Sequence, residues 1–410
     1  MKKFFALLLS LAMVLALVAC GQKDPTPDTP DTPDDPQTKV EYKVAMITDY
    51  GDITDQSFNQ TTYEACKAFA EDNSIEFSYF KPAGDNTADR VAMIEKAVDE
   101  GFNVIVMPGY AFGGAIVEAA PEFPDVKFIA LDVAAGDLLE TAVAKAGEAY
   151  DYPPENWDLN KYVDMSNVYC AVYQEELCGY MAGYAAVKLG YKNLGFLGGM
   201  SVPAVVRYGY GFVQGVDAAA ADLGLTDVKL NYIYGGQFFG DADITAVMDT
   251  WYQGGTEVVF ACGGGIYTSA VDAAKKVGAK VIGVDVDQAG VIANYAGVDG
   301  MTVTSAMKGL YPATYDTLTD VIVNGNWEKY VGKIETLGLV SGTDPEANYV
   351  QIPMGDGTQW SDSFTQDDYK AMVKDMFDGK ITVSNNTSSD VSAADFATVI
   401  TVDDQGSIKG

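Results

Sequence analysis

The sequence contains no histidine, and its basic residues are few. Without imidazole the chain cannot form a Ser-His-Asp or Cys-His catalytic group, or any metal site that histidine ligates. Its 26 lysines and arginines are outnumbered by 58 aspartates and glutamates, which gives a formal net charge of −32. This charge argues against nucleic acid or anionic lipid as a partner of the folded body. We therefore expect an acidic, soluble, extracytoplasmic protein with no metal site and no cofactor.

Cysteine is also scarce, with five residues in the whole chain. Cys20 belongs to the N-terminal segment described below. The other four stand singly inside apolar patterns, without C-x-x-C spacing: Cys66, Cys170, Cys178 and Cys262. We expect them to be buried free thiols. A disulfide between Cys170 and Cys178 is the alternative that the sequence leaves open.

Residues 1–19 have the pattern of a bacterial signal peptide. Two lysines precede an apolar run from Phe4 to Ala19, which is too short to span a membrane comfortably. The run ends in Leu-Val-Ala-Cys20-Gly, which resembles a lipobox and implies cleavage before Cys20 with diacylglycerol on its sulfur. The alternative is an ordinary secretory signal with a cysteine near the cleavage site.

Residues 20–40 are predicted to be the lipidated cysteine and a tether. Between residues 22 and 38 the chain is rich in proline, aspartate and threonine and has no hydrophobic residue, so it cannot bury a core. Proline extends the backbone, and at about 3.1 Å per residue the segment would reach ~50 Å. We therefore expect a folded body attached to a membrane through Cys20.

From Lys43 onward, apolar strand-like runs alternate with helix-like patterns. This alternation predicts an α/β protein, and 410 residues suit two domains. Each half ends a strand with an aspartate, Asp132 and Asp285, at positions that face the crevice in open parallel sheets. We therefore predict a two-lobed clamshell in which each lobe is a doubly wound, mostly parallel sheet.

The same pattern suggests where the lobes begin and end. The predicted N-terminal lobe comprises residues 41–165 with 301–335, and the predicted C-terminal lobe comprises residues 166–300 with 336–383. Residues 384–410 are predicted to be a loosely attached polar tail. Within the first lobe, the Ala/Glu-rich and Pro-containing stretch from 134 to 165 interrupts the alternation of strands and helices and is interpreted as an inserted flap or a surface excursion.

A polar loop from Asp49 to Gln60 follows the first strand and leads into a helix. Its D-x-G-x-x-x-D-x-S-F-N-Q pattern resembles the signature of the basic membrane lipoprotein family, the PnrA-like nucleoside-binding components of ABC importers. The resemblance recurs in family order over roughly residues 43–383, most specifically in Gly-Val-Asp-Val-Asp-Gln at 283–288. It implies a type I periplasmic-binding-protein-like fold that binds a ligand and is not an enzyme.

In that family a nucleoside's base is stacked between aromatic rings. The resemblance implies that Phe58 and Tyr208 hold these positions, although Tyr208 replaces the phenylalanine expected there. Asp49 and Asn59 match positions that hydrogen-bond the base. The alternatives are a hydrophobic staple for Phe58, helix packing for Tyr208, and turn and helix caps for Asp49 and Asn59.

The resemblance also implies that acids and a lysine hold the ribose, with Asp132, Asp285 and Lys308 as the candidates. A carboxylate can accept both hydrogen bonds of a vicinal diol. For Lys308 the alternative is a structural salt bridge. Tyr110 follows a strand end and either lines the cleft or packs. Gly263 opens a glycine run that lets the backbone approach a ligand, and because no Lys-Ser/Thr follows, a phosphate loop is not predicted.

Taken together, these residues predict a lipid-anchored solute-binding protein on the extracytoplasmic face of the cell membrane. We expect it to capture a purine nucleoside (adenosine, guanosine or inosine) and to deliver it to an ABC permease. One alternative is a binding protein for a sugar or another small polar metabolite. A second is a nucleoside hydrolase that uses the same carboxylates. A third is a ligand-sensing regulator with the same clamshell, which the sequence disfavours because it shows no DNA-binding headpiece.

Overall fold

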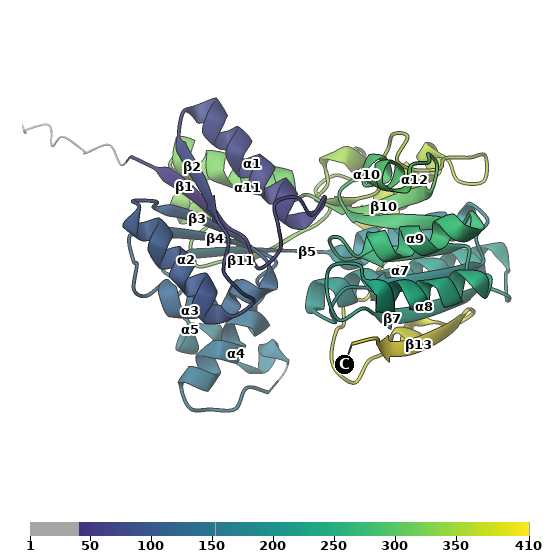
Figure 1. Cartoon of the computed structure of the whole chain (residues 1–410), viewed down its shortest axis with the longest axis horizontal. Coiled ribbons are helices and arrows are strands. Elements are labelled where there is room, and N and C mark those ends of the chain that lie inside the picture. The colour runs from purple at the N-terminus through teal and green to yellow at the C-terminus, as the bar shows by residue number, and fades with distance from the viewer. Residues whose placement is uncertain (1–40, 152, 410) are drawn as a thin grey trace, which may run out of the picture. The chain divides into compact units, whose positions relative to one another are not determined.

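The computed structural model describes residues 41–151 and 153–409 of the chain. The predicted signal peptide (1–19) and tether (20–40), with Cys20, lie outside these residues. Two separate β-sheets organise the described residues, and helices cover both faces of each (Figure 1). We call each sheet with the helices packed on it a lobe.

The first sheet has six parallel strands in the order β11-β5-β4-β3-β1-β2. The strands are β1 (Lys43–Ile47), β2 (Glu76–Phe80), β3 (Val104–Pro108), β4 (Lys127–Leu131), β5 (Val168–Tyr173) and β11 (Ile334–Leu337). Strand β3 reads Val-Ile-Val-Met-Pro and is buried throughout, as expected for a parallel strand covered on both faces.

Alternate side chains of the first sheet supply two cores. Val44 and Met46 pack toward α1 and α11, whereas Ala45 and Ile47 pack toward α2, α3 and α4. The helices of this lobe are α1 (Phe58–Asn73), α2 (Thr87–Asp99), α3 (Gly113–Ala119), α4 (Ala135–Lys145), α5 (Leu159–Tyr162) and α11 (Leu310–Leu318). Both α4 and α5 lie in the predicted 134–165 flap, whose aromatic residues Trp157 and Tyr162 are in contact at 5.6 Å between ring centroids.

The second sheet has seven strands in the order β12-β10-β9-β8-β6-β7-β13. Strand β12 is antiparallel to β10, and the other pairings are parallel. The strands are β6 (Asn193–Gly198), β7 (Lys229–Tyr234), β8 (Val258–Cys262), β9 (Lys280–Asp285), β10 (Thr302–Lys308), β12 (Val350–Gln351) and β13 (Thr401–Ser407).

Six helices cover the second sheet. Helices α6 and α7 share a core on one face, and α8, α9 and α10 share a core on the other. Their bounds are α6 (Glu175–Lys188), α7 (Pro203–Leu223), α8 (Ala242–Gln253), α9 (Tyr267–Val277), α10 (Ala289–Ala296) and α12 (Gln366–Phe377). Helices α6 and α7 pack very closely because both carry glycines at the contact. A Cβ atom on Gly211 would lie 2.1 Å from the carbonyl oxygen of Glu176, so only glycine fits there.

The chain crosses between the lobes after β5, after β10 and after β11, and the three crossing segments are hydrogen-bonded to one another. The backbone N–H of Gln174 donates to the carbonyl of Leu337 (3.0 Å), and that of Tyr349 donates to the carbonyl of Gly338 (3.0 Å). The N–H of Gly309 completes the set by donating to the carbonyl of Tyr349 (2.7 Å). These crossings form the connection about which the two lobes would open and close.

The sheets divide the chain at positions other than those predicted. The first lobe was expected to end at 165, but β5 pairs with β4 and the chain crosses only after Tyr173. Residues from 301 were expected in the first lobe, yet β10 pairs with β9 of the second sheet. The return to the first lobe begins with α11, which packs on α1. Strand β11 then joins β5, so the first lobe extends beyond residue 335 to Leu337.

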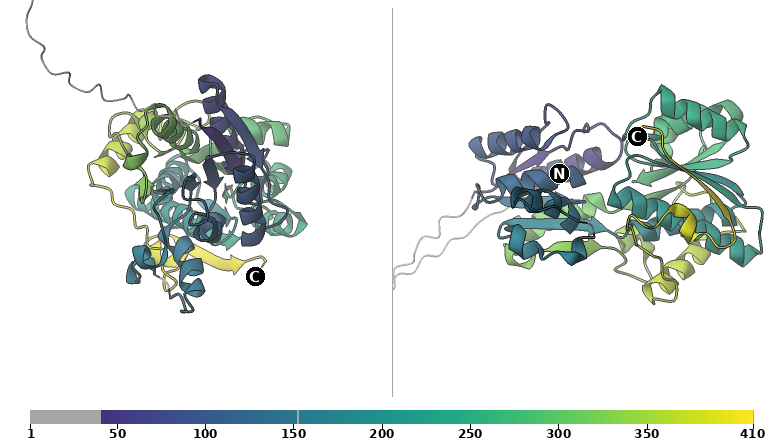
Figure 2. Two further views of the ribbon diagram at one scale, coloured as in Figure 1. Left: turned by 90° about the vertical axis from the view of Figure 1, so that its left-hand side faces the viewer. Right: turned by 90° about the horizontal axis from the view of Figure 1, so that it is seen from below.

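The sequence predicts a loose tail at residues 384–410, but its described part, residues 384–409, packs against the second lobe. Strand β13 pairs in parallel with β7 at the edge of the sheet, where Figures 1 and 2 show it in yellow. The carboxylate of Asp217 accepts hydrogen bonds from the backbone N–H groups of Thr398, Val399 and Ile400. Most side chains of β13 are exposed, because an edge strand needs no apolar face toward a core. Its sequence therefore lacks the apolar pattern that would predict a strand.

The four cysteines in the described residues, Cys66, Cys170, Cys178 and Cys262, are free and buried. The prediction of buried thiols is therefore confirmed, and Cys170 and Cys178 are not bridged. Among residues 41–151 and 153–409, we find no helix that combines the length and the apolar character needed to cross a membrane.

Candidate ligand-binding site

A cavity of about 410 Å³ is lined by residues of both lobes. Its size falls within the range of about 300–1,000 Å³ that is usual for small-molecule sites. It lies where strands β1, β3 and β4 of the first sheet and β8, β9 and β10 of the second end, which is the expected ligand position in parallel sheets. The nine residues predicted from the sequence all line it: Asp49, Phe58, Asn59, Tyr110, Asp132, Tyr208, Gly263, Asp285 and Lys308.

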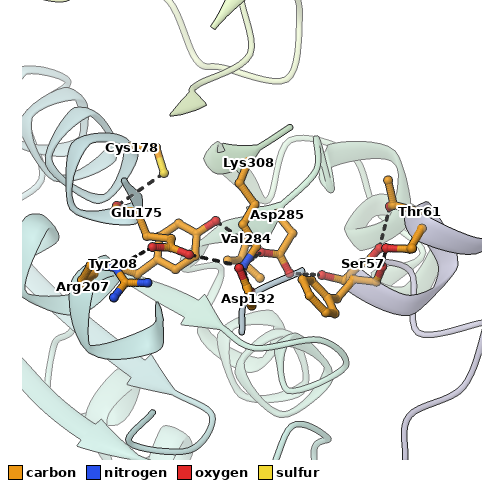
Figure 3. Close-up of polar contacts among 12 residues, drawn as sticks. Ser57, Thr61, Asp132, Glu175, Cys178, Arg207, Tyr208, Val284, Asp285 and Lys308 are labelled. Carbon is orange, nitrogen blue, oxygen red and sulfur yellow. Dashed lines mark hydrogen bonds and ion pairs between the residues drawn. The ribbon is translucent and has the colours of Figure 1, made fainter. Parts of the chain in front are cut away.

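Asp132 and Asp285 hold matching positions in the two lobes. Asp132 directly follows β4, and Asp285 is the last residue of β9. Both have left-handed backbones, with φ of 59° and 65°. Residues other than glycine adopt this conformation rarely, with aspartate among the more tolerant, and such strain tends to gather at functional sites. The two carboxylates converge on the ammonium group of Lys308 (Figure 3).

The Lys308 ammonium sits among three carboxylates. It is ion-paired to Asp132, and its Nζ lies 3.7 Å from Oδ1 of Asp285 and 3.6 Å from Oε1 of Glu175. Burial disfavours the ammonium form, but Asp132, Asp285 and Glu175 outweigh it and raise the pKa of Lys308 above its ordinary value. Lys308 is therefore a charged donor at neutral pH.

Aromatic rings surround the same ammonium. Nζ of Lys308 lies 4.8 Å from the ring centroid of Phe58, 5.4 Å from that of Tyr173 and 5.6 Å from that of Tyr208. Cation–π contacts of this kind are strongest where water is excluded. They fix the ammonium next to the two rings, Phe58 and Tyr208, that the sequence predicts to stack on a base.

The buried cluster carries more negative than positive charge. Asp132, Glu175 and Asp285 supply three carboxylates, whereas Lys308 and Arg207 supply two cations. Burial raises the pKa of Asp132 to about 6, although the Lys308 ammonium opposes the shift. Oδ1 of Asp132 is buried and has no hydrogen-bond partner. It is an acceptor that a ligand hydroxyl could satisfy.

Asp285 also joins the two lobes directly. The hydroxyl of Ser57, from the loop before α1, donates to Oδ2 of Asp285 at 2.6 Å. The hydroxyl of Tyr208, from α7, donates to Oδ1 at 3.2 Å. The phenolic group that distinguishes Tyr208 from the expected phenylalanine therefore orients Asp285, and it does not only pack within its helix.

The loop before α1 presents a second group of acceptors. Oδ1 of Asp49 accepts from the N–H groups of Tyr50 (2.6 Å) and Gly51 (2.7 Å) and from Nδ2 of Asn59 (3.2 Å). Oδ2 of Asp49 has no partner among the described residues. Burial raises the pKa of Asp49 despite these hydrogen bonds. One oxygen of Asp49 thus holds the turn, and the other is available to a ligand.

Asn59 is held by its neighbours and does not cap the helix. Asp55 performs the capping, because its carboxylate accepts from the backbone N–H groups of Ser57, Asn59 and Gln60. Oδ2 of Asp55 also accepts from Nδ2 of Asn59 at 3.1 Å. With its donor group engaged, Asn59 has its Oδ1 buried and unpartnered, so it offers an acceptor.

Tyr110 of the first lobe and Gly263 of the second lobe both line the cavity. The hydroxyls of Tyr110 and Tyr50 donate to the sulfur of Met200 at 3.6 and 3.7 Å. Gly263 has φ of 153°, and a Cβ atom there would lie 2.8 Å from the ring of Phe238. The wall at Gly263 therefore requires glycine.

Several residues of the site were missed from the sequence. Arg207 lines the cavity and donates from Nε to Oε2 of Glu175 at 2.7 Å, and Glu175 lies behind it, fully buried. Asp137 also lines the cavity, and burial raises its pKa to about 7. Glu175 follows a strand end, as Asp132 does, so the same rule could have found it. Arg207 stands beside Tyr208, where only the aromatic residue was considered.

The chain was compared with protein families and with individual proteins, and one family model matches most of it. A sequence profile of the family described as "ABC transporter substrate-binding protein PnrA-like" matches residues 42–343. The chain is 25% identical over 392 residues to the "ABC transporter nucleoside-binding protein BmpA" of Lactococcus lactis subsp. cremoris, covering 92% of this chain and 96% of that protein. It is 28% identical over 336 residues to the "CD4+ T-cell-stimulating antigen" of Listeria monocytogenes, covering 78% of this chain and 84% of that protein.

Among solved structures, the chain resembles a solute-binding protein of an ABC transporter system from Aeropyrum pernix. The TM-score is 0.59 at 20% sequence identity, over 84% of this chain and 88% of that one. At this identity the likeness concerns the fold, and it confirms the predicted two-lobed α/β architecture of periplasmic solute-binding proteins.

Proposed function

Because this chain belongs to the PnrA-like family of ABC transporter substrate-binding proteins, we propose that its cavity captures purine nucleosides such as adenosine, guanosine or inosine. The family consists of transport components, so the chain is a binding protein for a small molecule and not an enzyme, and its partners include an ABC permease. The nucleoside-binding name of the Lactococcus relative supports the choice of ligand.

The observation that carries the proposal is the pairing of aromatic faces with a cluster of acceptors in one cavity. Phe58 and Tyr208 offer flat apolar surfaces on which a base can stack. Asp132 and Asp285 offer carboxylate oxygens to a vicinal diol, and Lys308 offers a donor between them. A free sugar would use the carboxylates but has no planar base to stack between the two rings.

We assign the remaining roles from the free hydrogen-bonding atoms. Oδ1 of Asn59 and Oδ2 of Asp49 would accept from the polar edge of the base. The unpartnered Oδ1 of Asp132 would accept from a ribose hydroxyl. Tyr110 and the glycine at 263 would form the walls that exclude water. Closure of the two lobes over the ligand would then select the state that the permease recognises.

A thermal-shift panel on the intact chain tests this proposal, since a ligand that binds only the folded state raises its apparent stability. Inosine, guanosine and adenosine should each raise the melting temperature, whereas ribose and glucose should not. A sugar that stabilises the protein as much as inosine does would replace the nucleoside proposal with a sugar-binding one.

We also propose that the chain is held at the extracytoplasmic face of the cell membrane by a lipid on Cys20. Cys20→Ser should release the protein from the membrane fraction without changing its affinity for inosine, because the assigned binding residues all lie between Asp49 and Lys308. Fractionation of cells grown with a labelled fatty acid measures both location and lipidation. Label on the Cys20→Ser protein at the wild-type level would refute the assignment.

A further inference from the structure

We propose that Glu175 is a positioning residue that orients the two cations of the cavity, Lys308 and Arg207, toward the ligand. The inference rests on the proposed function, since it assumes that the cavity binds a nucleoside. It concerns a side chain that does not itself line the cavity. Its effect on binding would therefore be exerted entirely through the two cations.

The carboxylate of Glu175 bridges these cations. Oε2 accepts from Nε of Arg207 at 2.7 Å, and Oε1 lies 3.6 Å from Nζ of Lys308 without a further hydrogen bond (Figure 3). The Nη groups of Arg207 donate no hydrogen bond within the described residues. Glu175 binds Nε and so holds the guanidinium group in place. The Nη donors of Arg207 can then bind an acceptor in the cavity.

The position of Glu175 in the fold makes it suited to this role. It is the first residue of α6 and comes directly after the crossing from β5, next to Gln174, whose N–H is bonded to Leu337. Lys308 ends β10 at the next crossing. Glu175 thus links two of the three crossing segments through Lys308, at the point where the lobes meet.

The neighbouring residue Glu176 shows that a place in the first turn of α6 is not enough to bring a carboxylate into contact with Arg207 and Lys308. Glu176 is also buried in the first turn of α6, where the helix dipole favours both carboxylates. Glu176 forms no ion pair within the described residues, and its Oε2 has no hydrogen-bond partner. Of the two glutamates, only Glu175 forms ion pairs with Arg207 and Lys308, so Glu176 provides a control that is buried in the same turn without such a contact.

Calorimetric titration of the intact chain with inosine tests the proposal, using Glu175→Gln, Glu176→Gln, Lys308→Met and the double variant Glu175→Gln/Lys308→Met. Glu175→Gln keeps the shape but removes the charge, and should weaken inosine about tenfold, the scale of one charge-assisted hydrogen bond. Glu176→Gln should change the affinity less than about twofold. The double variant should lose less than the product of the two single losses, because both act on one ammonium.

The outcomes separate cleanly, provided that each variant melts cooperatively. Wild-type affinity in Glu175→Gln, equal losses in both glutamine variants, or losses that multiply in the double variant would each overturn the positioning role. Failure of the wild-type chain to bind any of inosine, guanosine and adenosine would instead refute the proposed function. If Glu175→Gln does not fold, Glu175→Asp keeps the charge but withdraws it by one methylene. It should still weaken inosine several-fold, and wild-type affinity would overturn the proposal.

Discussion

At the scale of single residues, Asp285 has protein partners on both of its carboxylate oxygens as well as a predicted role in binding the ligand. It accepts hydrogen bonds from Ser57 of the first lobe and Tyr208 of the second, and it lies 3.7 Å from the Lys308 ammonium. A ribose hydroxyl would have to share or displace one of these donors. The contacts of Asp285 would therefore change both when a ligand binds and when the two lobes approach each other.

The expected result for Asp285→Ala is selective loss of the sugar contact. Charge-assisted hydrogen bonds contribute about 1.5–3 kcal/mol each, so inosine should bind at least about tenfold more weakly. Hypoxanthine, which has no ribose, should lose much less. Calorimetry with both ligands measures the difference. Asp287→Ala is the matched control, because Asp287 is exposed and lies outside the cavity lining. Equal losses for nucleoside and base would withdraw the ribose assignment.

At the scale of elements, the glycine contacts between α6 and α7 position the site. These helices begin with Glu175 and Pro203, and Arg207 and Tyr208 lie in the early turns of α7. A change in their spacing would move Arg207 away from Glu175. The cavity chemistry therefore depends on residues that never approach the ligand.

Gly211→Ala should be strongly destabilising and should also weaken inosine. The new methyl carbon would lie 2.1 Å from the carbonyl oxygen of Glu176, so the helices must separate. Overpacking of this kind typically costs about 1–3 kcal/mol of unfolding free energy. Urea unfolding measures the loss. Gly224→Ala is not a fair control because its φ is positive, whereas Gly290→Ala has open space and should be nearly neutral by comparison. An unchanged stability in Gly211→Ala would mean that the helices are not in close contact.

The sequence predicted where strands occur, but it did not predict which sheet each strand joins. The apolar run at Val168–Val172 predicts a strand correctly, yet it cannot say that β5 pairs with β4 rather than with the second sheet. Long-range pairing decides that question, and local periodicity carries no information on it. For the same reason, β13, with its exposed Thr-Val-Asp-Asp-Gln-Gly-Ser, could not be recognised as a strand.

The sequence predicted the residues of the site more accurately than the lobe boundaries, because the site residues lie in motifs and at strand ends. All nine predicted positions line one cavity, although their contacts with a ligand stay a prediction. Asp137 was missed because an acidic residue in the first turn of a helix is usually interpreted as a capping residue, whereas Glu175 follows a strand end and could have been found by the rule that identified Asp132. The position of Asp137 in the cavity lining arises from packing between distant segments.

At the scale of the whole molecule, the acidic composition extends into the interior. Burial raises the pKa of Asp137 and of Glu176 to about 7 and that of Asp132 to about 6. Each group binds its proton more tightly in the folded chain than in the unfolded chain, where its pKa is ordinary. The stability that this provides is present below the ordinary pKa and is lost as pH rises through the folded value.

The unliganded protein should therefore be more stable at about pH 5.5 than at about pH 8. In Asp137→Asn, which cannot ionise, the difference in unfolding free energy between the two conditions should shrink by about 1–2 kcal/mol. Urea unfolding at both pH values measures it. Asp125→Asn serves as the control, because that carboxyl is exposed on the loop before β4. A wild-type chain that is more stable at the higher pH would contradict the account of buried carboxyls.

The central claim is that one cavity between the lobes holds a purine nucleoside, and a crystal structure of the chain with inosine tests it most directly. The base should lie between the rings of Phe58 and Tyr208, with the ribose hydroxyls within hydrogen-bond distance of Asp132 and Asp285. Lys308 should donate to a ribose oxygen. Inosine bound outside this cavity, or with its ribose away from both carboxylates, would contradict the account.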